Sequence, residues 1–365
     1  MRPRRAVQNL VQAPSLRGSW DVPAPTLQFS VTGYSGFEDE ILQLLNANRP
    51  ATLTRRWLDW RYTQLPGVPP PKVFWIRLND RPAVGMASLI FRRYWVNGEP
   101  RDVAVLGDIS LKKDLRGLGL GRQLMAFIGR HLNSWPNHSA FVIPTSAAER
   151  CLSATGWTTA GRFVPHVFLM DPTDALRRTV RREWLARGIA ALYKRAIATG
   201  LRLTGPRRAS LQLVDDVDET FDTLWRQFPK RNLILRDMSQ ETLRWRYIRH
   251  PDHRFRAAKL MTEEGLTGYL IFEVGQQDRT CRIHDILVKR PRDLRRMLVL
   301  FAQHVQTMGH PSSIRIVLAD RHPYGRSLWK SGFVARPAQS VFQVRSAERG
   351  FNQQAWHLTA GDKDV

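Results

Sequence analysis

The feature that most restricts the fold of this chain is an internal repeat. Each matching pair is listed with the earlier segment first: Trp60-Arg61-Tyr62 and Trp245-Arg246-Tyr247, Val84 to Phe91 and Leu266 to Phe272, Gly107 to Leu111 and His284 to Val288, Thr155-Gly156-Trp157 and Ser331-Gly332-Phe333. The pairs keep the same order and lie about 180 residues apart, as expected for a tandem duplication. A length of 365 residues suits two domains. We therefore expect two copies of one fold.

The pattern of apolar residues predicts the elements of the first copy. Helices are expected between residues 36 and 61 and at 122–133, where apolar residues recur at helical spacing. Strands are expected at 73–78, 83–94, 103–111 and 140–144, the first three joined by hairpin turns rich in Asn, Gly and Pro. The sequence therefore predicts an α/β (α+β) fold in which each domain is a mixed, mostly antiparallel sheet flanked by helices.

Composition suggests boundaries for these domains. The expected parts are an irregular N-terminal arm at 1–30, a first domain at 31–171, a basic amphipathic linker helix at 172–209, a second domain at 210–346 and a C-terminal tail at 347–365. The linker residues 174–208 combine an apolar stripe with many arginines. This helix either packs on one domain or lies on an anionic membrane surface as a peripheral contact.

Charge and cysteine content limit the classes of function. Lys and Arg number 56 against 32 Asp and Glu, a net charge of +24. Such a charge is typical of proteins with anionic partners, but also of a solvated arginine-rich surface, and the chain shows no nucleic-acid-binding signature. Cys151 and Cys281 lack neighbours at metal-ligand spacing, so no metal is expected. Without a long apolar run or a signal-peptide core, a cytoplasmic protein is expected.

The segment most suggestive of chemistry joins the third strand to the following helix. It reads Arg116-Gly117-Leu118-Gly119-Leu120-Gly121-Arg122. Glycines allow the backbone to approach a ligand closely, and the start of a helix carries partial positive charge, so the loop suits a pyrophosphate. A dinucleotide-binding loop would instead need a parallel strand–helix–strand unit and an acidic residue about 20 positions later.

Arg116, Gly119 and Gly121 fit the coenzyme A pyrophosphate loop of the GCN5-related N-acetyltransferase (GNAT) superfamily, which this chain resembles. In addition, Gly156-Trp157 stands where that family has Gly-Phe. The resemblance covers 31–171 and, by the order of strands, 210–346. It implies an acyl-coenzyme A (acyl-CoA) dependent N-acyltransferase, with acetyl-CoA as co-substrate and a small-molecule primary amine as acceptor. The residues implied to bind coenzyme A are Ile109, Leu111, Arg116, Gly117, Leu118, Gly119, Leu120, Gly121 and Arg122.

The resemblance also implies a catalytic base, for which Asp108 is the candidate, three residues before Leu111. A structural carboxylate paired with arginine is the alternative, because Asp285 occupies the same position in the second copy. The tyrosine that serves the family as general acid is replaced by Leu152. Direct attack by the amine therefore lacks its usual acid in this chain.

Three aromatic residues, Trp57, Trp60 and Tyr62, fall in the region that lines the acceptor side in the family. Since the triplet recurs at 245–247, packing in the core is the competing explanation. The segment 288–296 of the second copy contains arginines but no glycine, which predicts a degenerate copy. Two other functions stay open: transfer from an acidic acyl carrier protein or a long-chain donor, and a catalytically silent binding module. The sequence does not indicate the oligomeric state.

Overall fold

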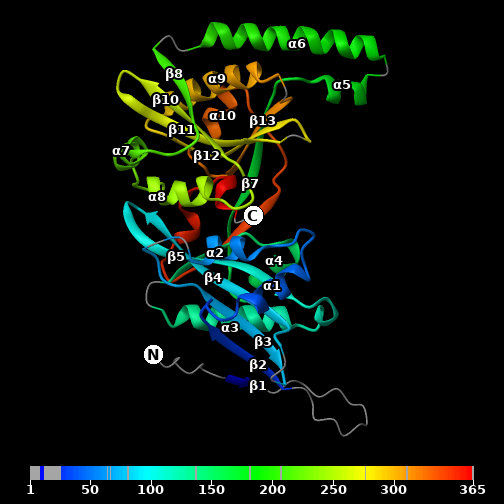
Figure 1. The fold of residues 1–365 in the computed structure, drawn as a ribbon, viewed down its shortest axis with the longest axis vertical. Coiled ribbons are helices and arrows are strands. Elements are labelled where there is room, and N and C mark those ends of the chain that lie inside the picture. Colours follow the sequence, from blue (N-terminus) through cyan, green and yellow to red (C-terminus); the bar gives the residue numbers. More distant parts are fainter. Residues whose placement is uncertain are drawn as a thin grey trace. The chain divides into compact units, whose positions relative to one another are not determined.

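The computed structural model describes residues 9–11, 26–63, 65, 67–79, 82–135, 138–180, 182–205, 208–275, 277–309 and 311–363. The chain forms two compact units. The first comprises residues 1–94, 100–161 and 340–354, and the second comprises residues 95–99, 162–339 and 355–365. Each is built on a mixed, mostly antiparallel sheet flanked by helices, which confirms the expected fold class (Figure 1).

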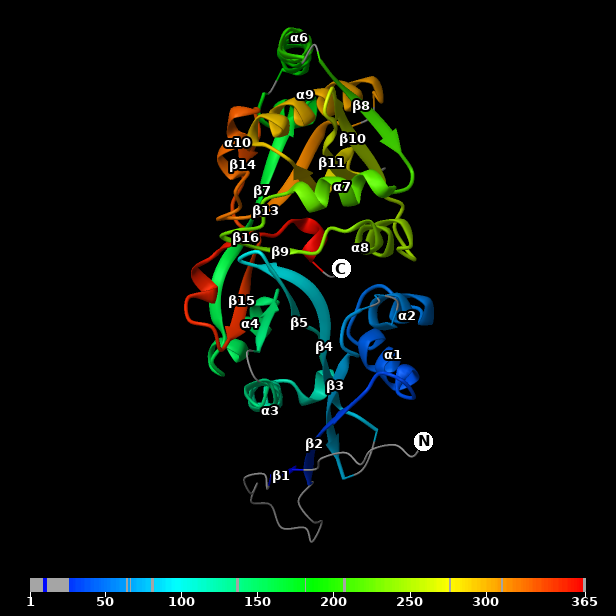
Figure 2. The ribbon, with the colours of Figure 1, turned by 90° about the vertical axis from the view of Figure 1, so that its left-hand side faces the viewer.

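The first unit places helices on both faces of its sheet. In sheet order its strands are β1 (Asn9–Val11), β2 (Leu27–Thr32), β3 (Lys72–Leu78), β4 (Gly85–Val96), β5 (Glu99–Leu111), β6 (Ser139–Val142) and β15 (Ser340–Ser346). Its helices are α1 (Glu38–Asn46), α2 (Arg55–Thr63), η1 (Lys113–Leu115), α3 (Leu120–Asn133), α4 (Ser146–Ser153) and η3 (Phe351–Gln353). Figure 2 shows α1 and α2 on one side of the strands and α3 on the other. The three successive strands expected from the sequence are β3, β4 and β5.

The core of the first unit follows from alternation along its strands. Phe74 and Ile76 of β3 face α3, which contributes Leu124, Phe127 and Ile128 to the same apolar cluster. Side chains of a strand alternate between faces, whereas apolar residues of a helix recur every three or four positions. The sheet and α3 therefore enclose one core, and the loop that enters α3 is held at its rim.

The second unit repeats this plan. In sheet order its strands are β7 (Thr158–Leu169), β13 (Ser313–Ala319), β12 (Thr280–Val288), β11 (Gly265–Val274), β10 (Arg256–Thr262) and β8 (Ala209–Val214), while β14 (Val334–Ala335) pairs with β7 and β9 (Leu233–Arg236) pairs with β16 (Ala355–His357). Its helices are α5 (Thr173–Thr179), α6 (Glu183–Thr204), α7 (Glu219–Gln227), α8 (Gln240–Leu243), η2 (Arg244–Ile248), α9 (Pro291–Thr307), α10 (Gly325–Lys330) and η4 (Ala360–Asp362). Tyr269 and Ile271 pack toward α7, and Leu270 and Phe272 toward α9.

The last strands of the two halves are exchanged. Residues 163–169 of β7 pair with 313–319 of β13 in the second unit. Conversely, residues 343–346 of β15 pair with 139–142 of β6 in the first unit. The compact units therefore differ from the continuous ranges 31–171 and 210–346. Because an apolar strand shows the same alternation beside either neighbour, the sequence pattern does not reveal this exchange.

Two expected segments differ in the structure. Residues 9–11 and 27–30 of the arm expected to be irregular belong to β1 and β2, and most of its other residues lie outside the described ones. The expected single helix at 172–209 is two helices, α5 and α6, with residues 180 and 182 extended. A continuous helix would align arginines at 177, 178, 181 and 182 four residues apart, which is unfavourable for like charges.

Candidate active site

The glycine-rich loop between β5 and α3 leaves backbone amide groups available. Gly117 and Gly119 have φ values of +85° and +80°, which other residues rarely adopt. Gly119 is the N-cap of α3, and it has no side chain to accept hydrogen bonds from the first turn. Leu118 and the side chains of Arg116 and Arg122 are exposed. This combination of uncapped amides, helix dipole and arginine is suited to a phosphate group.

Strand β5 separates from its neighbour just before this loop. It pairs in parallel with β6 at Ala104 and Val105, whereas β5 itself continues to Leu111. Within this strand Asp108 has a φ of +51°, an uncommon conformation for a residue with a side chain. Past Val105, no pairing with β6 is found among the described residues. Ile109 and Leu111 therefore lie on a stretch of strand with backbone groups that a ligand could bind.

Asp108 lies at the centre of a buried polar cluster. Its Oδ2 accepts hydrogen bonds from Arg61 Nε at 2.9 Å, Tyr62 Oη at 2.8 Å and Ser88 Oγ at 3.0 Å. Its Oδ1 accepts from Arg49 Nη2 at 3.1 Å. Burial alone would raise the pKa of Asp108, but the charges of Arg61 and Arg49 and these hydrogen bonds hold that pKa below its ordinary value. The carboxylate is therefore held as the anion.

The three aromatic candidates for acceptor binding are buried. Trp57, Trp60 and Tyr62 all belong to α2 and are part of the interior of the first unit. Trp57 lies between two guanidinium groups, those of Arg49 at 5.4 Å and Arg61 at 5.3 Å from its ring centre. Packing in the core is enough to account for these three aromatic residues. Their role in binding an acceptor stays a prediction. Leu152 is also buried, in the core beside α3.

Two residues that the sequence analysis did not identify connect the loop to this cluster. Asn48 accepts a hydrogen bond from Arg116 Nη2 and donates one to Ser110 Oγ at 2.7 Å. Arg49, whose side chain is one-third exposed, extends from the same turn to Asp108. The available signal was an arginine about ten residues before each Trp-Arg-Tyr triplet, Arg49 in one copy and Arg236 in the other.

The acetyltransferase (GNAT) family matches the sequence over residues 38–149. This range includes the loop, the separated strand and the Asp108 cluster. This segment is a GNAT domain. No curated protein matches the chain in sequence.

Solved structures resemble the chain as a whole in fold. A conserved protein of Enterococcus faecalis described as a probable N-acyltransferase has a TM-score of 0.62 at 11% identity, over 89% of this chain and 73% of that one. N-myristoyltransferase of Saccharomyces cerevisiae with bound myristoyl-CoA has a TM-score of 0.50 at 11% identity, over 87% and 82%. A tandem GNAT protein from the clavulanic acid biosynthesis pathway has 0.51 at 15%, over 88% and 99%. At these identities the likeness shows a tandem GNAT fold.

The second unit keeps the buried aspartate of the GNAT domain. Asp285 accepts a hydrogen bond from Tyr247 Oη at 2.9 Å and another from Arg236, as Asp108 does from Tyr62 and Arg49. Glycines also match: a Cβ on Gly85 would lie 2.8 Å from Leu111 Cδ1, and one on Gly268 would lie 2.7 Å from Val288 Cγ1. These shared contacts support the duplication.

The second unit lacks the phosphate-binding loop. Strand β12 ends at Val288 and α9 begins at Pro291, so the connection is short and contains no glycine. Asp293 places a buried carboxylate in the first turn of α9. Glu264 pairs with Arg290 at 2.6 Å and with Lys289 at 3.3 Å. Carboxylates of the protein thus occupy the helix start and neutralise the basic residues, which disfavours a phosphate.

The end of the chain fills the corresponding opening of the second unit. Strand β12 pairs with β13 at residues 280–283 and then, like β5, continues without that partner. Thr359 forms a bridge with Leu318 of β13, and Ala319 N donates to Leu358 O at 3.0 Å. Gly361 packs against Tyr247 and the His284 carbonyl. The part of β12 that corresponds to the ligand-binding end of β5 is therefore covered by residues near the end of the chain.

Two further tests of the structure concern metals and membranes. Among the described residues, no group of three or more His, Cys, Asp or Glu side chains is arranged to hold a metal ion. None of the helices in the described ranges is long and apolar enough to cross a bilayer. Independently of these two results, the family match over residues 38–149 supports acyl-CoA-dependent N-acyltransferase activity.

Proposed function

We propose that the GNAT domain transfers an acetyl group from acetyl-CoA to a primary amine of a small molecule. The observation that carries this proposal is the pair of left-handed glycines, Gly117 and Gly119, at the uncapped start of α3, next to the part of β5 that lies beyond its pairing with β6. The amides and Arg116 would hold the pyrophosphate of coenzyme A. The backbone at Ile109 and Leu111 would align the arm that ends in the thioester.

The reaction follows as a direct transfer. The neutral amine attacks the thioester carbonyl carbon, a C–N bond forms and the C–S bond breaks. The nitrogen loses a proton, and the departing thiolate takes one up. A backbone N–H of β5 would stabilise the negative charge that develops on the carbonyl oxygen. With Leu152 at the position of the usual acid, we propose that the thiolate is protonated by water.

Asp108 is poorly suited to act as the catalytic base. A base near neutral pH works best when its pKa is close to that pH, whereas the arginines around Asp108 lower its pKa. Its hydrogen bonds to Tyr62, Arg61 and Arg49 instead position the separated end of β5. Catalysis by Asp108 stays a prediction, which a comparison of the variants Asp108→Asn and Asp285→Asn tests.

Binding of acetyl-CoA tests the proposed site directly. In isothermal titration calorimetry, wild-type protein is expected to bind acetyl-CoA, and the double variant Gly119→Val with Gly121→Val is expected to bind at least about tenfold more weakly, a loss of about 1.4 kcal/mol. Gly309→Val is the matched control, since Gly309 has a φ of +69° and open space around its Cβ position but lies far along the chain, after α9. Equal binding by both variants would overturn the assignment of the loop.

A second function is transfer of a longer acyl group, from coenzyme A or from an acidic carrier protein. The fold shared with a myristoyltransferase is the observation in its favour. Turnover of acyl-CoA esters of increasing chain length, and of carrier-bound acyl groups, separates the two activities. A protein that binds acetyl-CoA but transfers no acyl group to any amine would instead be the silent binding module.

A further inference from the structure

Helix α6 presents a stripe of large apolar side chains to solvent. Ile189, Leu192 and Leu203 are 45%, 71% and 81% exposed, and Trp184 near the start of the helix is 67% exposed. At 100° per residue, residues 189, 192, 196 and 203 fall on one side of the helix. Large exposed apolar side chains outside α6 in the described chain are Leu118, Trp329 and Val334. Large exposed apolar side chains gathered on one side of a helix are typical of an interaction site.

A different side of α6 is already in use, so the stripe does not result from a loose helix. Ala186, Ala190 and Leu201 are buried against the second unit. Tyr193 Oη donates to Leu169 O at 3.0 Å, and Gln303 Nε2 of α9 donates to Leu201 O at 2.8 Å. The helix therefore has one apolar face for packing and another that is free.

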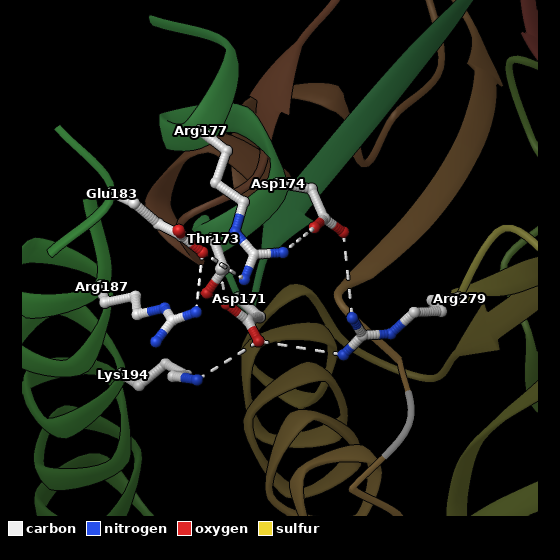
Figure 3. A network of polar contacts seen from close by, with 8 residues as sticks. All are labelled: Asp171, Thr173, Asp174, Arg177, Glu183, Arg187, Lys194 and Arg279. Atoms are coloured by element: carbon white, nitrogen blue, oxygen red, sulfur yellow. Dashed lines mark hydrogen bonds and ion pairs between the residues drawn. The ribbon is translucent and has the colours of Figure 1, made fainter. Parts of the chain in front are cut away.

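Ion pairs fix the start of α6 on the second unit. Figure 3 shows Asp171, just after β7, between Lys194 at 3.3 Å and Arg279 at 3.8 Å. In the same view Glu183 pairs with Arg187 at 2.7 Å and with Arg177 of α5 at 3.5 Å. These contacts hold α6 in one orientation relative to the sheet of its own unit.

Positive charge borders the free stripe. Arg195 and Arg202 are exposed and form no ion pair among the described residues, and the helical rotation places both along one edge of the stripe. The whole chain carries a net charge of +24. A helix with an exposed apolar line beside unpaired arginines has the form of an interfacial helix, which inserts apolar side chains between lipid headgroups.

We propose that α6 docks the protein on an anionic membrane surface, with Ile189, Leu192 and Leu203 inserted and Arg195 and Arg202 at the headgroups. At 1.5 Å per residue the stripe from Ile189 to Leu203 is about 21 Å long, and a flat bilayer contacts all of it at once. An acidic carrier protein would be attracted by the same arginines. It would leave the line of large apolar side chains unexplained, which favours the membrane.

Co-sedimentation with lipid vesicles tests the docking. The full chain is mixed with vesicles of phosphatidylglycerol and phosphatidylcholine, or of phosphatidylcholine alone. The test variant combines Leu192→Glu with Leu203→Glu, and Trp329→Glu is the matched control because Trp329 is 75% exposed on α10 of the same unit. All these side chains are exposed, so the variants are expected to fold, which circular dichroism and acetyl-CoA binding check.

Wild-type protein and Trp329→Glu are expected to bind the anionic vesicles, and Leu192→Glu with Leu203→Glu is expected to reduce binding at least tenfold. Arg195→Ala with Arg202→Ala should weaken binding and reduce its dependence on salt. The proposal is overturned if wild-type protein stays in the supernatant, or if the glutamate variant binds vesicles as wild type does. It is also overturned if an acidic acyl carrier protein binds α6 and the vesicles do not.

Discussion

The Tyr62 hydroxyl donates a 2.8 Å hydrogen bond to the buried carboxylate of Asp108. Tyr247 makes the same contact with Asp285 at 2.9 Å in the second unit, where the phosphate-binding loop is missing and the chain end fills the opening. The second unit keeps this contact although it has no cofactor site, so the contact is needed for folding. The pair therefore separates what the fold requires from what the chemistry requires.

Replacing Asp108 with asparagine is expected to destabilise the first unit. The neutral amide leaves the guanidinium groups of Arg61 and Arg49 without their counter-charge, and breaking a buried pair in this way costs about 3 to 5 kcal/mol. Asp285→Asn is the matched variant, since it removes the closer of two ion pairs of Arg236 in the second unit and leaves the one with Asp362 at 3.7 Å. Urea unfolding measures both, and a loss below about 1 kcal/mol for Asp108→Asn would contradict a structural role.

Activity per folded molecule then distinguishes the two roles of Asp108. Loss of a base lowers the rate by about 10²- to 10⁴-fold, whereas a structural carboxylate changes mainly the folded fraction. We expect kcat/KM to change little once it is corrected for folding. Because the pKa of Asp108 is lowered in the folded state, its stabilisation is present above about pH 4 and is lost as pH falls through the folded pKa. Asp108→Asn should therefore weaken the acid-induced loss of stability.

Calorimetry is expected to give one bound acetyl-CoA per chain. The GNAT domain has free amides at Gly119 and the first turn of α3. At the corresponding place in the second unit, Asp293 occupies the first turn of α9 and Glu264 neutralises Arg290. Two equivalent sites per chain would contradict the assignment of the second copy as degenerate.

Much of this architecture can be predicted from the sequence because it depends on local patterns. Alternation predicted β3, β4 and β5, and the glycines at 117, 119 and 121 marked the loop that enters α3. Both signals act within a few residues of the chain. The fold class and the GNAT resemblance followed from them.

The remaining features depend on contacts between distant residues. The exchange of β7 and β15 and the placement of residues 358–362 against β12 and β13 join segments far apart in sequence. The environment of Asp108 is similar, because Arg49 contacts it from a turn with no recognisable motif. The repeat located both aspartates, but only the structure shows that arginines lower the pKa of Asp108.

Protonation of His357 is expected to weaken the second unit in acid. Its ring is buried beside His322, with 4.2 Å between ring centres, and within the described part of the chain neither ring nitrogen has a hydrogen-bond partner. Burial lowers the pKa of His357 to about 4, against about 6.5 when unfolded. The unfolded state thus binds more protons between these values, so stability falls by about 3 kcal/mol as pH decreases from about 6.5 to about 4.

The variant His357→Phe isolates this effect. Phenylalanine has a similar size and does not titrate, so its urea-unfolding curve should depend less on pH across that range, while at pH 8 it should resemble wild type. His322, whose pKa is lowered by burial and by the charges of His357 and His166, would add a change in the same direction. An unchanged slope in His357→Phe would contradict the assignment.

A methyl group at Gly361 is expected to loosen the chain end in the second unit. In η4, a Cβ on this residue would overlap Tyr247 Oη and lie 2.9 Å from the carbonyl oxygen of His284. Overpacking of this kind typically costs about 1 to 3 kcal/mol. Gly325→Ala is the matched control, because its Cβ would meet nothing within 4 Å.

Urea unfolding and limited proteolysis together show which part responds. Gly361→Ala should lower stability and expose residues 355–363 to cleavage, whereas Gly325→Ala should not. Binding of acetyl-CoA should be retained in both variants, because the loop at Gly117 and Gly119 is in the other unit. Loss of acetyl-CoA binding in Gly361→Ala alone would instead show that the closed second unit supports the site. In that case the duplication would serve catalysis as well as folding.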